Sequence, residues 1–215
     1  MDGIPSAGSS ASRFDNTLGG TRIDNSLKYT SATMSGFKVN AMVGLGEVAG
    51  SNSAGQYLSL GAGYNAGPIS AGLGYQIRKC VAASGCTATQ DDDKLFAIGG
   101  GYNFGPAKLA AVYTTEKNAK NVKGNDANVV HVMVQVPMGP WFLSAGYQQL
   151  NDKTLLNQDV KQYNLSALYS LSKRTTLYGA FSQQKVDNGG KAGMALTTSS
   201  NSKQSIYAAG IRHTF

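Results

Sequence analysis

Charged side chains are scarce in this sequence. Asp, Glu, Lys and Arg make up 14% of the 215 residues, whereas a soluble domain carries about 25%. Long hydrophobic runs are missing as well, since the stretch from Leu95 to Tyr102 is far shorter than the ~18 apolar residues that a membrane-spanning helix needs. A helical membrane protein is therefore excluded, and the low charge is unlike that of an ordinary soluble surface.

Cysteine and histidine are also rare, with two residues of each. Cys80 and Cys86 share one polar stretch that offers no further cysteine or histidine, which argues against a zinc site and favours a small disulfide loop, with two free thiols as the alternative. His131 and His213 belong to no catalytic motif. We therefore expect no enzyme activity, no cofactor and no metal.

Glycine, by contrast, is abundant: 27 of the 215 residues are glycine, about 13% against a usual ~7%. The 11 tyrosines and 7 phenylalanines recur at regular places, which argues against disorder. The formal net charge is +7, but the basic residues are scattered along the chain. Nucleic acid is therefore not expected as a partner.

Apolar residues alternate with small or polar residues along most of the chain. Between residues 69 and 76, Ile, Ala, Leu and Tyr occupy the odd positions and Ser, Gly, Gly and Gln the even ones. A period of two predicts β-strands. The expected strands are residues 22–31, 36–46, 56–65, 68–78, 94–103, 106–116, 127–137, 140–150, 159–170, 173–184 and 204–215.

The connections between these strands alternate between short and long. Three short ones contain Gly-Pro, and an aromatic residue follows each proline by seven residues, namely Tyr75, Tyr113 and Tyr147. The other connections are long and polar. Short turns at one end, long loops at the other and aromatic belts are typical of an all-β, transmembrane antiparallel β-barrel. A soluble lipocalin-like barrel is the alternative, but its interior would be too wide for these small side chains to fill.

Several segments resemble general porins of the β-proteobacterial branch. Residues 169–178, with the sequence YSLSKRTTLY, are similar to the penultimate periplasmic turn of that family. Residues 24–31, 36–37 and 46–50 are similar to the strands that follow its constriction loop. The last strand, with Tyr207, Ile211 and Phe215 at alternate positions, is similar to the signal read by the outer-membrane assembly machinery.

The resemblance implies a location in the bacterial outer membrane and a 16-stranded barrel, of which this chain would supply the last eleven strands. We expect residues 1–21 to be a leader or a remnant of the constriction loop. Residues 22–215 would form the barrel strands, with long extracellular loops and short periplasmic turns. The implied function is a water-filled channel for passive diffusion of small hydrophilic solutes. It would act as a homotrimer surrounded by the lipid bilayer and lipopolysaccharide. The alternative is an adhesion or receptor barrel that acts through its long loops.

Basic residues outnumber acidic residues on the face that would line the lumen. By alternation, that face carries Arg22, Lys28, Lys38, Arg78, Lys108, Arg174 and Arg212, against Asp24 and Glu116. Arg22, Lys28, Lys38, Arg78 and Arg212 are the candidate pore-lining residues, and Arg22 lies nearest the depth of the narrow zone. Because a positive wall accumulates anions, we expect an anion preference.

Overall fold

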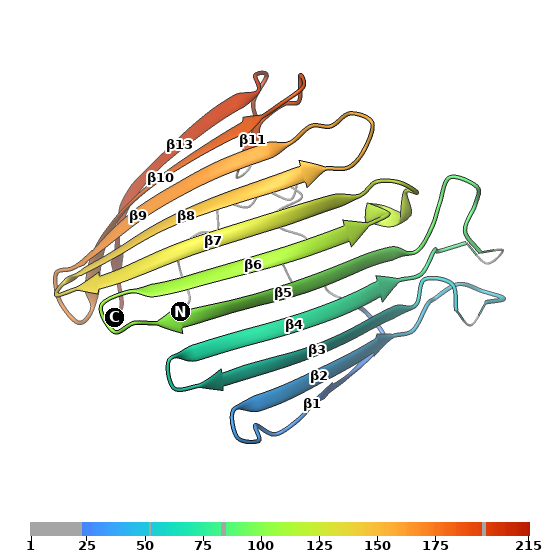
Figure 1. The fold of residues 1–215 in the computed structure, drawn as a ribbon, viewed down its shortest axis with the longest axis horizontal. Helices are drawn as coiled ribbons and strands as arrows, with labels where there is room; N and C mark the ends of the chain where they lie inside the picture. The colour runs from blue at the N-terminus through green and yellow to red at the C-terminus, as the bar shows by residue number, and fades with distance from the viewer. Residues whose placement is uncertain (1–22, 52, 83–84, 195–196) are drawn as a thin grey trace.

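A single antiparallel sheet dominates the computed structural model (Figure 1), which describes residues 23–51, 53–82, 85–194 and 197–215. Eleven strands follow one another in the sheet in chain order, except that β13 is the neighbour of β10. The strands are β1 Ser26–Thr30, β2 Phe37–Gly44, β3 Tyr57–Ala66, β4 Ile69–Arg78, β5 Asp93–Asn103, β6 Lys108–Lys117, β7 Ala127–Met138, β8 Trp141–Asp152, β9 Val160–Ser170, β10 Thr175–Val186 and β13 Lys203–His213. The all-β antiparallel class and the eleven strands are thus confirmed, with boundaries that differ by a few residues.

Smaller elements lie in two of the long connections. A 3-10 turn, η2 Ala119–Asn121, lies between β6 and β7. A short hairpin of β11 Gly193–Met194 and β12 Thr197–Thr198 lies between β10 and β13. The sequence predicts only a polar loop there, because two-residue strands are too short for alternation to show. Among the described residues, no helix has the length and apolar character needed to cross a membrane.

Two of the three Gly-Pro pairs form two-residue turns. Gly67 and Pro68 join β3 to β4, and Gly139 and Pro140 join β7 to β8. The two glycines have φ of +55° and +59°. A two-residue hairpin loop with a positive φ at its first position favours glycine there, and the fixed negative φ of proline suits the second position.

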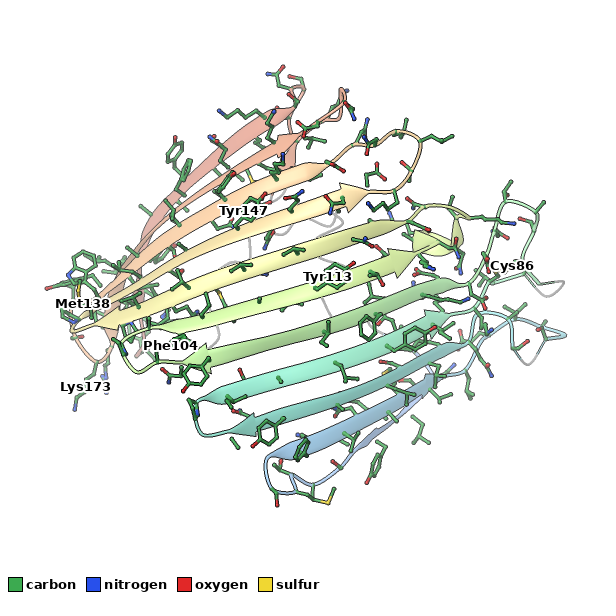
Figure 2. All side chains as sticks on the ribbon, in the orientation of Figure 1. Cys86, Phe104, Tyr113, Met138, Tyr147 and Lys173 are labelled. Carbon is green, nitrogen blue, oxygen red and sulfur yellow. A yellow bond between two sulfur atoms is a disulfide. The ribbon has the colours of Figure 1, made fainter. Side chains whose placement is uncertain are left out.

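One face of the sheet is apolar and exposed. Leu27, Leu73 and Tyr207 on this face are 80%, 52% and 78% exposed. The face also carries cross-strand ring pairs at two levels, with centroids 4.6–5.0 Å apart: Phe37–Tyr64 and Trp141–Tyr169 near the short turns, and Tyr147–Tyr163 and Phe181–Tyr207 farther along the strands. Figure 2 shows Met138 and Lys173 at the short-turn end of the sheet and Cys86 at the opposite end. An apolar band between aromatic belts is the surface that a lipid bilayer accommodates.

The sheet is open in the described part of the chain. Strands β1 and β13 form its two edges. Unpaired strand edges are costly in lipid, because no water is present to satisfy their backbone groups. Arg22 and the expected leader or loop remnant of residues 1–21 lie outside the described residues.

Candidate functional site

The face opposite the apolar one, here called the polar face, carries glycines on β3, β4 and β5 and polar side chains on the strands from β7 to β13. One cross-strand row follows this face across ten strands, through Lys38, Gly63, Gly72, Gly99, Val112, His131, Gln148, Gln162, Gln184 and Gln204. The row starts beside a short turn, at the second residue of β2, and ends beside a long loop, at the second residue of β13. This steady stagger is the tilt that strands adopt in a barrel wall.

Hydrogen bonds join the polar side chains of β9 and β10 into a ladder. Gln184 Nε2 donates to Gln162 Oε1 at 2.9 Å, and Gln162 Nε2 donates to Asn164 Oδ1 at 3.0 Å. Ser182 Oγ donates to the same Asn164 Oδ1 at 2.8 Å. Gln184 and Gln162 are only 2% and 5% exposed. Because both buried amides have partners, the ladder forms a hydrophilic wall without an unsatisfied side chain.

The β11–β12 hairpin lies over this ladder. Gly193 N donates to Gln184 Oε1 and Met194 N donates to Gln204 Oε1, each at 2.8 Å. Since both glutamines project from the polar face, β11, within the connection between β10 and β13, lies against that face. Met194 is fully buried. Sequence reasoning missed this contact, and its only signal was glutamine at even-numbered positions of neighbouring strands.

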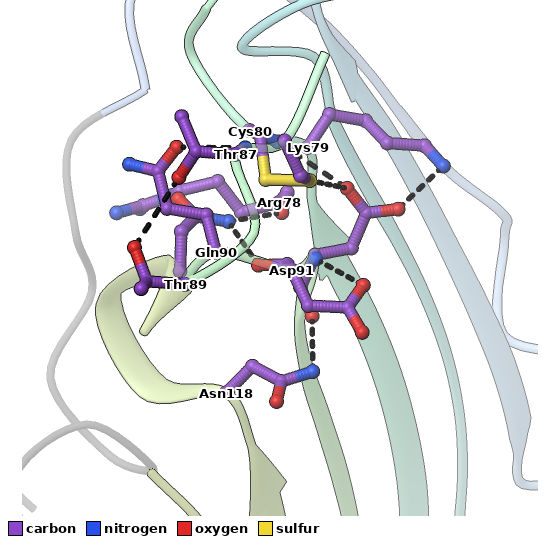
Figure 3. The surroundings of a disulfide bond; sticks show 11 residues. Arg78, Lys79, Cys80, Thr87, Thr89, Gln90, Asp91 and Asn118 are labelled. Carbon is purple, nitrogen blue, oxygen red and sulfur yellow. Dashed lines mark hydrogen bonds and ion pairs between the residues drawn. A yellow bond between two sulfur atoms is a disulfide. The ribbon is translucent and has the colours of Figure 1, made fainter. Parts of the chain in front are cut away.

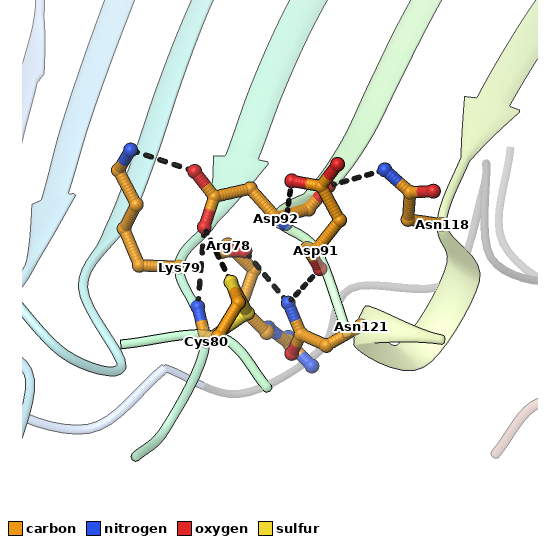
Figure 4. A network of polar contacts seen from close by, with 8 residues as sticks. Arg78, Lys79, Cys80, Asp91, Asp92, Asn118 and Asn121 are labelled. Atoms are coloured by element: carbon orange, nitrogen blue, oxygen red, sulfur yellow. Dashed lines mark hydrogen bonds and ion pairs between the residues drawn. A yellow bond between two sulfur atoms is a disulfide. The ribbon is translucent and has the colours of Figure 1, made fainter. Parts of the chain in front are cut away.

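At the long-loop end, two connections are tied together beside Arg78 (Figure 4). Asn121 Nδ2 donates to the main-chain oxygens of Arg78 and Asp91, at 3.0 and 3.1 Å. Asn118 Nδ2 donates to the main-chain oxygen of Asp92 at 3.1 Å. Asn118 and Asn121 have φ of +55° and +61°, a left-handed conformation that asparagine tolerates better than most residues. These bonds hold the loop 79–92 against the loop 118–126.

The loop 79–92 also contains a disulfide bond between Cys80 and Cys86 (Figure 3). The two Cα atoms are 5.3 Å apart, and Cys80 is 4% exposed. Asp92 accepts the Cys80 backbone N–H at 3.3 Å and pairs with Lys79 Nζ at 2.7 Å. The two sulfurs and the Asp92 carboxylate lie within 4.8 Å of one another. Because the sulfurs are bonded to each other, the group offers no thiolate to a metal.

We expect thiol titration of the denatured, unreduced protein to detect no free thiol. The closed loop is short, so replacing Cys80 and Cys86 by serine is expected to lower the free energy of unfolding by only about 2 kcal/mol. Denaturant titration of the oxidised protein and of the double serine variant would measure that difference. Two titratable thiols in the unreduced protein would contradict the pairing.

Four of the five candidate pore-lining residues lie on the polar face: Lys28, Lys38, Arg78 and Arg212. The fifth, Arg22, lies outside the described residues. Lys28, Lys38 and Arg212 are exposed, whereas Arg78 is partly buried with its guanidinium carbon 6.0 Å from the ring centroid of Tyr57. The structure does not bring these residues together. They are spread between the short-turn end, near Lys38 and Arg212, and the long-loop end at Arg78.

The acidic residues on the polar face differ from those that the sequence predicts. Asp93 and Asp152 lie there together with Glu116, whereas Asp24 lies outside the strands. The basic residue Arg174, which the sequence also placed on this face, lies outside the strands as well. The sequence placed Asp93 and Asp152 in loops, because the strands run one or two residues farther than the alternation. Asp152 and Glu116 are 6% and 8% exposed, and Asp93 Oδ2 accepts a backbone N–H at 3.1 Å. The acids are therefore engaged at the loop ends, and exposed lysines dominate the open part of the face.

Comparison with protein families and curated sequences gives a consistent result. A family model described as Gram-negative porin matches residues 1–189. Outer membrane porin protein 32 of Delftia acidovorans is 28% identical over 206 residues. The alignment covers 91% of this chain and 58% of that protein. The chain therefore spans less than two thirds of the length of this curated relative.

Solved porin structures share the fold. A refined porin structure matches with a TM-score of 0.66 at 20% identity, covering 88% of this chain and 61% of that one. OmpT of Vibrio cholerae in its trimer form matches with a TM-score of 0.65 at 16% identity, and the match covers 89% of this chain and 64% of that one. OmpF of Salmonella typhi, in complex with daunomycin, matches with a TM-score of 0.65 at 15% identity, and the match covers 88% of this chain and 62% of that one. At such identities the likeness concerns the arrangement of strands alone.

Proposed function

The chain belongs to the Gram-negative porin family and is an outer-membrane protein, and from that premise we propose that its sheet is part of the wall of a water-filled channel for small hydrophilic solutes. The two-faced sheet carries this proposal. The apolar face with its aromatic belts suits lipid, and the polar face of glycine, amide and lysine suits water. The family and the fold are those of channels rather than of enzymes.

In the membrane, we propose that both edges of the sheet are paired within a 16-stranded barrel. The support is physical, because an edge strand in lipid leaves backbone groups without partners. Residues 22–215 would then be barrel strands, and residues 1–21 a leader or a remnant of the constriction loop. Assembly of three such barrels is part of the proposal, in line with the trimer form of the Vibrio cholerae relative.

The hairpin-bearing connection 187–202 would narrow this channel at its long-loop end. Its support is the contact of Gly193 and Met194 with the polar-face glutamines, at 2.8 Å each. A connection held across the polar face takes up space that solutes would otherwise use. The remaining long connections would stay outside, on the extracellular side.

An anion preference of the channel is the finer part of the proposal. The exposed residues Lys28, Lys38, Lys108 and Arg212 leave the open part of the polar face positive, and a low-dielectric barrel focuses that field on passing ions. Arg22 would add to it near the narrow zone.

Reversal potentials under a salt gradient across a planar bilayer test the preference. Lys28→Gln is expected to lower the chloride-over-potassium permeability ratio more than Lys108→Gln, because Lys28 lies within the wall and Lys108 is the first residue after a short turn. Arg22→Ala is expected to act in the same direction as Lys28→Gln. The preference should weaken with salt, since the Debye length falls from about 10 Å at 0.1 M to about 3 Å at 1 M.

Three outcomes would count against these proposals. A cation-selective reversal potential for the unmodified channel would contradict the anion preference. Equal effects of Lys28→Gln and Lys108→Gln, which remove the same charge, would contradict the role of Lys28. Failure to observe any unit conductance from the assembled protein would contradict the channel itself.

A further inference from the structure

The apolar face carries charge at only one of its ends. Among the described strands, its Asp, Glu, Lys and Arg residues are all lysines beside the long loops: Lys94, Lys117, Lys161, Lys185 and Lys203. The short-turn end of the same face carries aromatic rings instead. The two ends of the lipid-facing surface are thus chemically different, and the long-loop end is basic.

Three of these lysines lie side by side on neighbouring strands. Lys161 of β9 is directly opposite Lys185 of β10, and Lys185 is directly opposite Lys203 of β13; we call these residues the lysine triplet. Like charges in directly opposed positions destabilise a sheet. Asp187 approaches Lys185 Nζ at 3.1 Å and Lys161 Nζ at 4.0 Å. One carboxylate among three ammonium groups leaves the triplet with an excess of positive charge.

The pairing of lysines recurs elsewhere on the face. Lys94 of β5 is directly opposite Lys117 of β6, at the same end of the sheet. Ammonium groups are therefore directly opposed at two separate places, both at the long-loop end of the lipid-facing surface. An anion supplied by the surroundings at that level would offset the repulsion at both.

An apolar groove of about 490 Å³ lies on β7 to β10, and two of these strands, β9 and β10, carry Lys161 and Lys185 of the triplet. Its lining includes Leu165 and Ala167 of β9 and Gly179 and Phe181 of β10, together with residues of β7 and β8. The depression arises where Ala167 has a small side chain and Gly179 has none, and an added Cβ at Gly179 would meet no atom within 4 Å. Phe181 is four residues from Lys185, about 13 Å along the strand.

We propose that the lysine triplet and this groove bind an anionic lipid of the surrounding leaflet, with its phosphate on the triplet and a fatty acyl chain in the groove. The spacing fits, since one leaflet supplies roughly half of the ~30 Å hydrocarbon core and the groove begins about 13 Å from the triplet. Charge complementarity selects the headgroup, and the adjoining apolar groove selects a lipid over a free phosphate ion. The proposal depends on the orientation of the apolar face and is independent of conduction.

The test measures retention of bisphosphorylated lipid A by the folded protein in nonionic detergent, as lipid per protein after gel filtration. Lys161→Gln, Lys185→Gln and Lys203→Gln together are expected to reduce retention about tenfold or more, because each lysine near an anionic lipid surface contributes to binding. The matched control replaces Lys123, Lys153 and Lys173 by glutamine. These lysines are exposed and lie in connections rather than in strands, so the control loses the same charge and is expected to retain the lipid.

Equal losses in the two triple variants would overturn the site, since net charge alone would then explain binding. Undiminished retention in the triplet variant would overturn it as well, and so would complete displacement of the lipid by inorganic phosphate. Circular dichroism and heat-modifiable migration would establish that each variant is folded before its lipid is counted.

A second variant tests the groove. Gly179→Leu is expected to fill it and to lower lipid retention severalfold, and the open space at this position accommodates the side chain. Gly100→Leu is the control, because Gly100 lies on the same apolar face of β5 and an added Cβ there makes only one ordinary contact, at 3.4 Å. Unchanged retention in Gly179→Leu would overturn the acyl-chain half of the proposal.

Discussion

Replacing Gln184 by leucine is expected to release the connection 187–202 from the polar face of the sheet. The side chain is 2% exposed, and it accepts the Gly193 N–H while donating to Gln162. Leucine fills the same volume but leaves a buried N–H and a buried carbonyl oxygen without partners, at a cost of roughly 1–3 kcal/mol each. The connection should then open at least about tenfold more often.

Limited trypsin digestion measures this opening, because Lys191 is an exposed cleavage site within the connection. We expect cleavage after Lys191 to become about tenfold faster in Gln184→Leu, and unit conductance of the proposed channel to rise as its lumen widens. Gln183→Leu is the matched control. Its amide lies on the apolar face and donates to the exposed Ser205 Oγ at 3.1 Å, its one side-chain partner in the part of the chain that the structure describes. Equal cleavage rates in the two variants would show that Gln184 does not hold the connection.

Loss of the apolar side chains at the C-terminal end of the chain, in β13 and just beyond it, is expected to block assembly into the membrane. Tyr207 and Ile211 are 78% and 62% exposed and project from the apolar side of the edge strand β13, and Phe215, two residues beyond the end of that strand, is 103% exposed. An exposed edge with alternating apolar side chains is the surface that strand addition recognises. Phe215→Ser should therefore reduce the folded, heat-modifiable protein in the outer membrane by about tenfold or more.

Leu171→Ser is the control for this prediction. Leu171 is also exposed, at 55%, but lies in the turn between β9 and β10. Quantitative blotting of outer-membrane fractions, heated and unheated, would compare the two variants with the unmodified protein. Normal assembly of Phe215→Ser would show that the terminal phenylalanine is no part of a recognition signal.

Much of the fold could be predicted because strand formation has a local signature. The period of two, the Gly-Pro turns and the recurring aromatics are local patterns. Each of them depends on the conformations and side chains of only a few neighbouring residues. The face occupied by Lys28, Lys38, Arg78 and Arg212 follows from the same parity. The pairing of Cys80 with Cys86 is also local, since few residues separate them.

Contacts between distant residues could not be predicted in this way. The alternating pattern of the sequence ends one or two residues before the strands do. Backbone pairing with neighbouring strands extends β5 to Asp93 and β8 to Asp152, and so brings two more acidic residues onto the polar face. The β11–β12 hairpin could not be expected from its own residues. Its position depends on Gln184 and Gln204, whose amides meet its backbone only when β10 and β13 lie side by side.

By itself, the sequence determined the all-β class, the two faces and the ends at which short and long connections lie, because each depends on the order of neighbouring residues. Tertiary structure alone decided the stagger from Lys38 to Gln204, the inward fold of the connection 187–202 and the alignment of the lysine triplet. These features are set by strand register. A shift of register changes which side chains oppose one another without changing any local pattern.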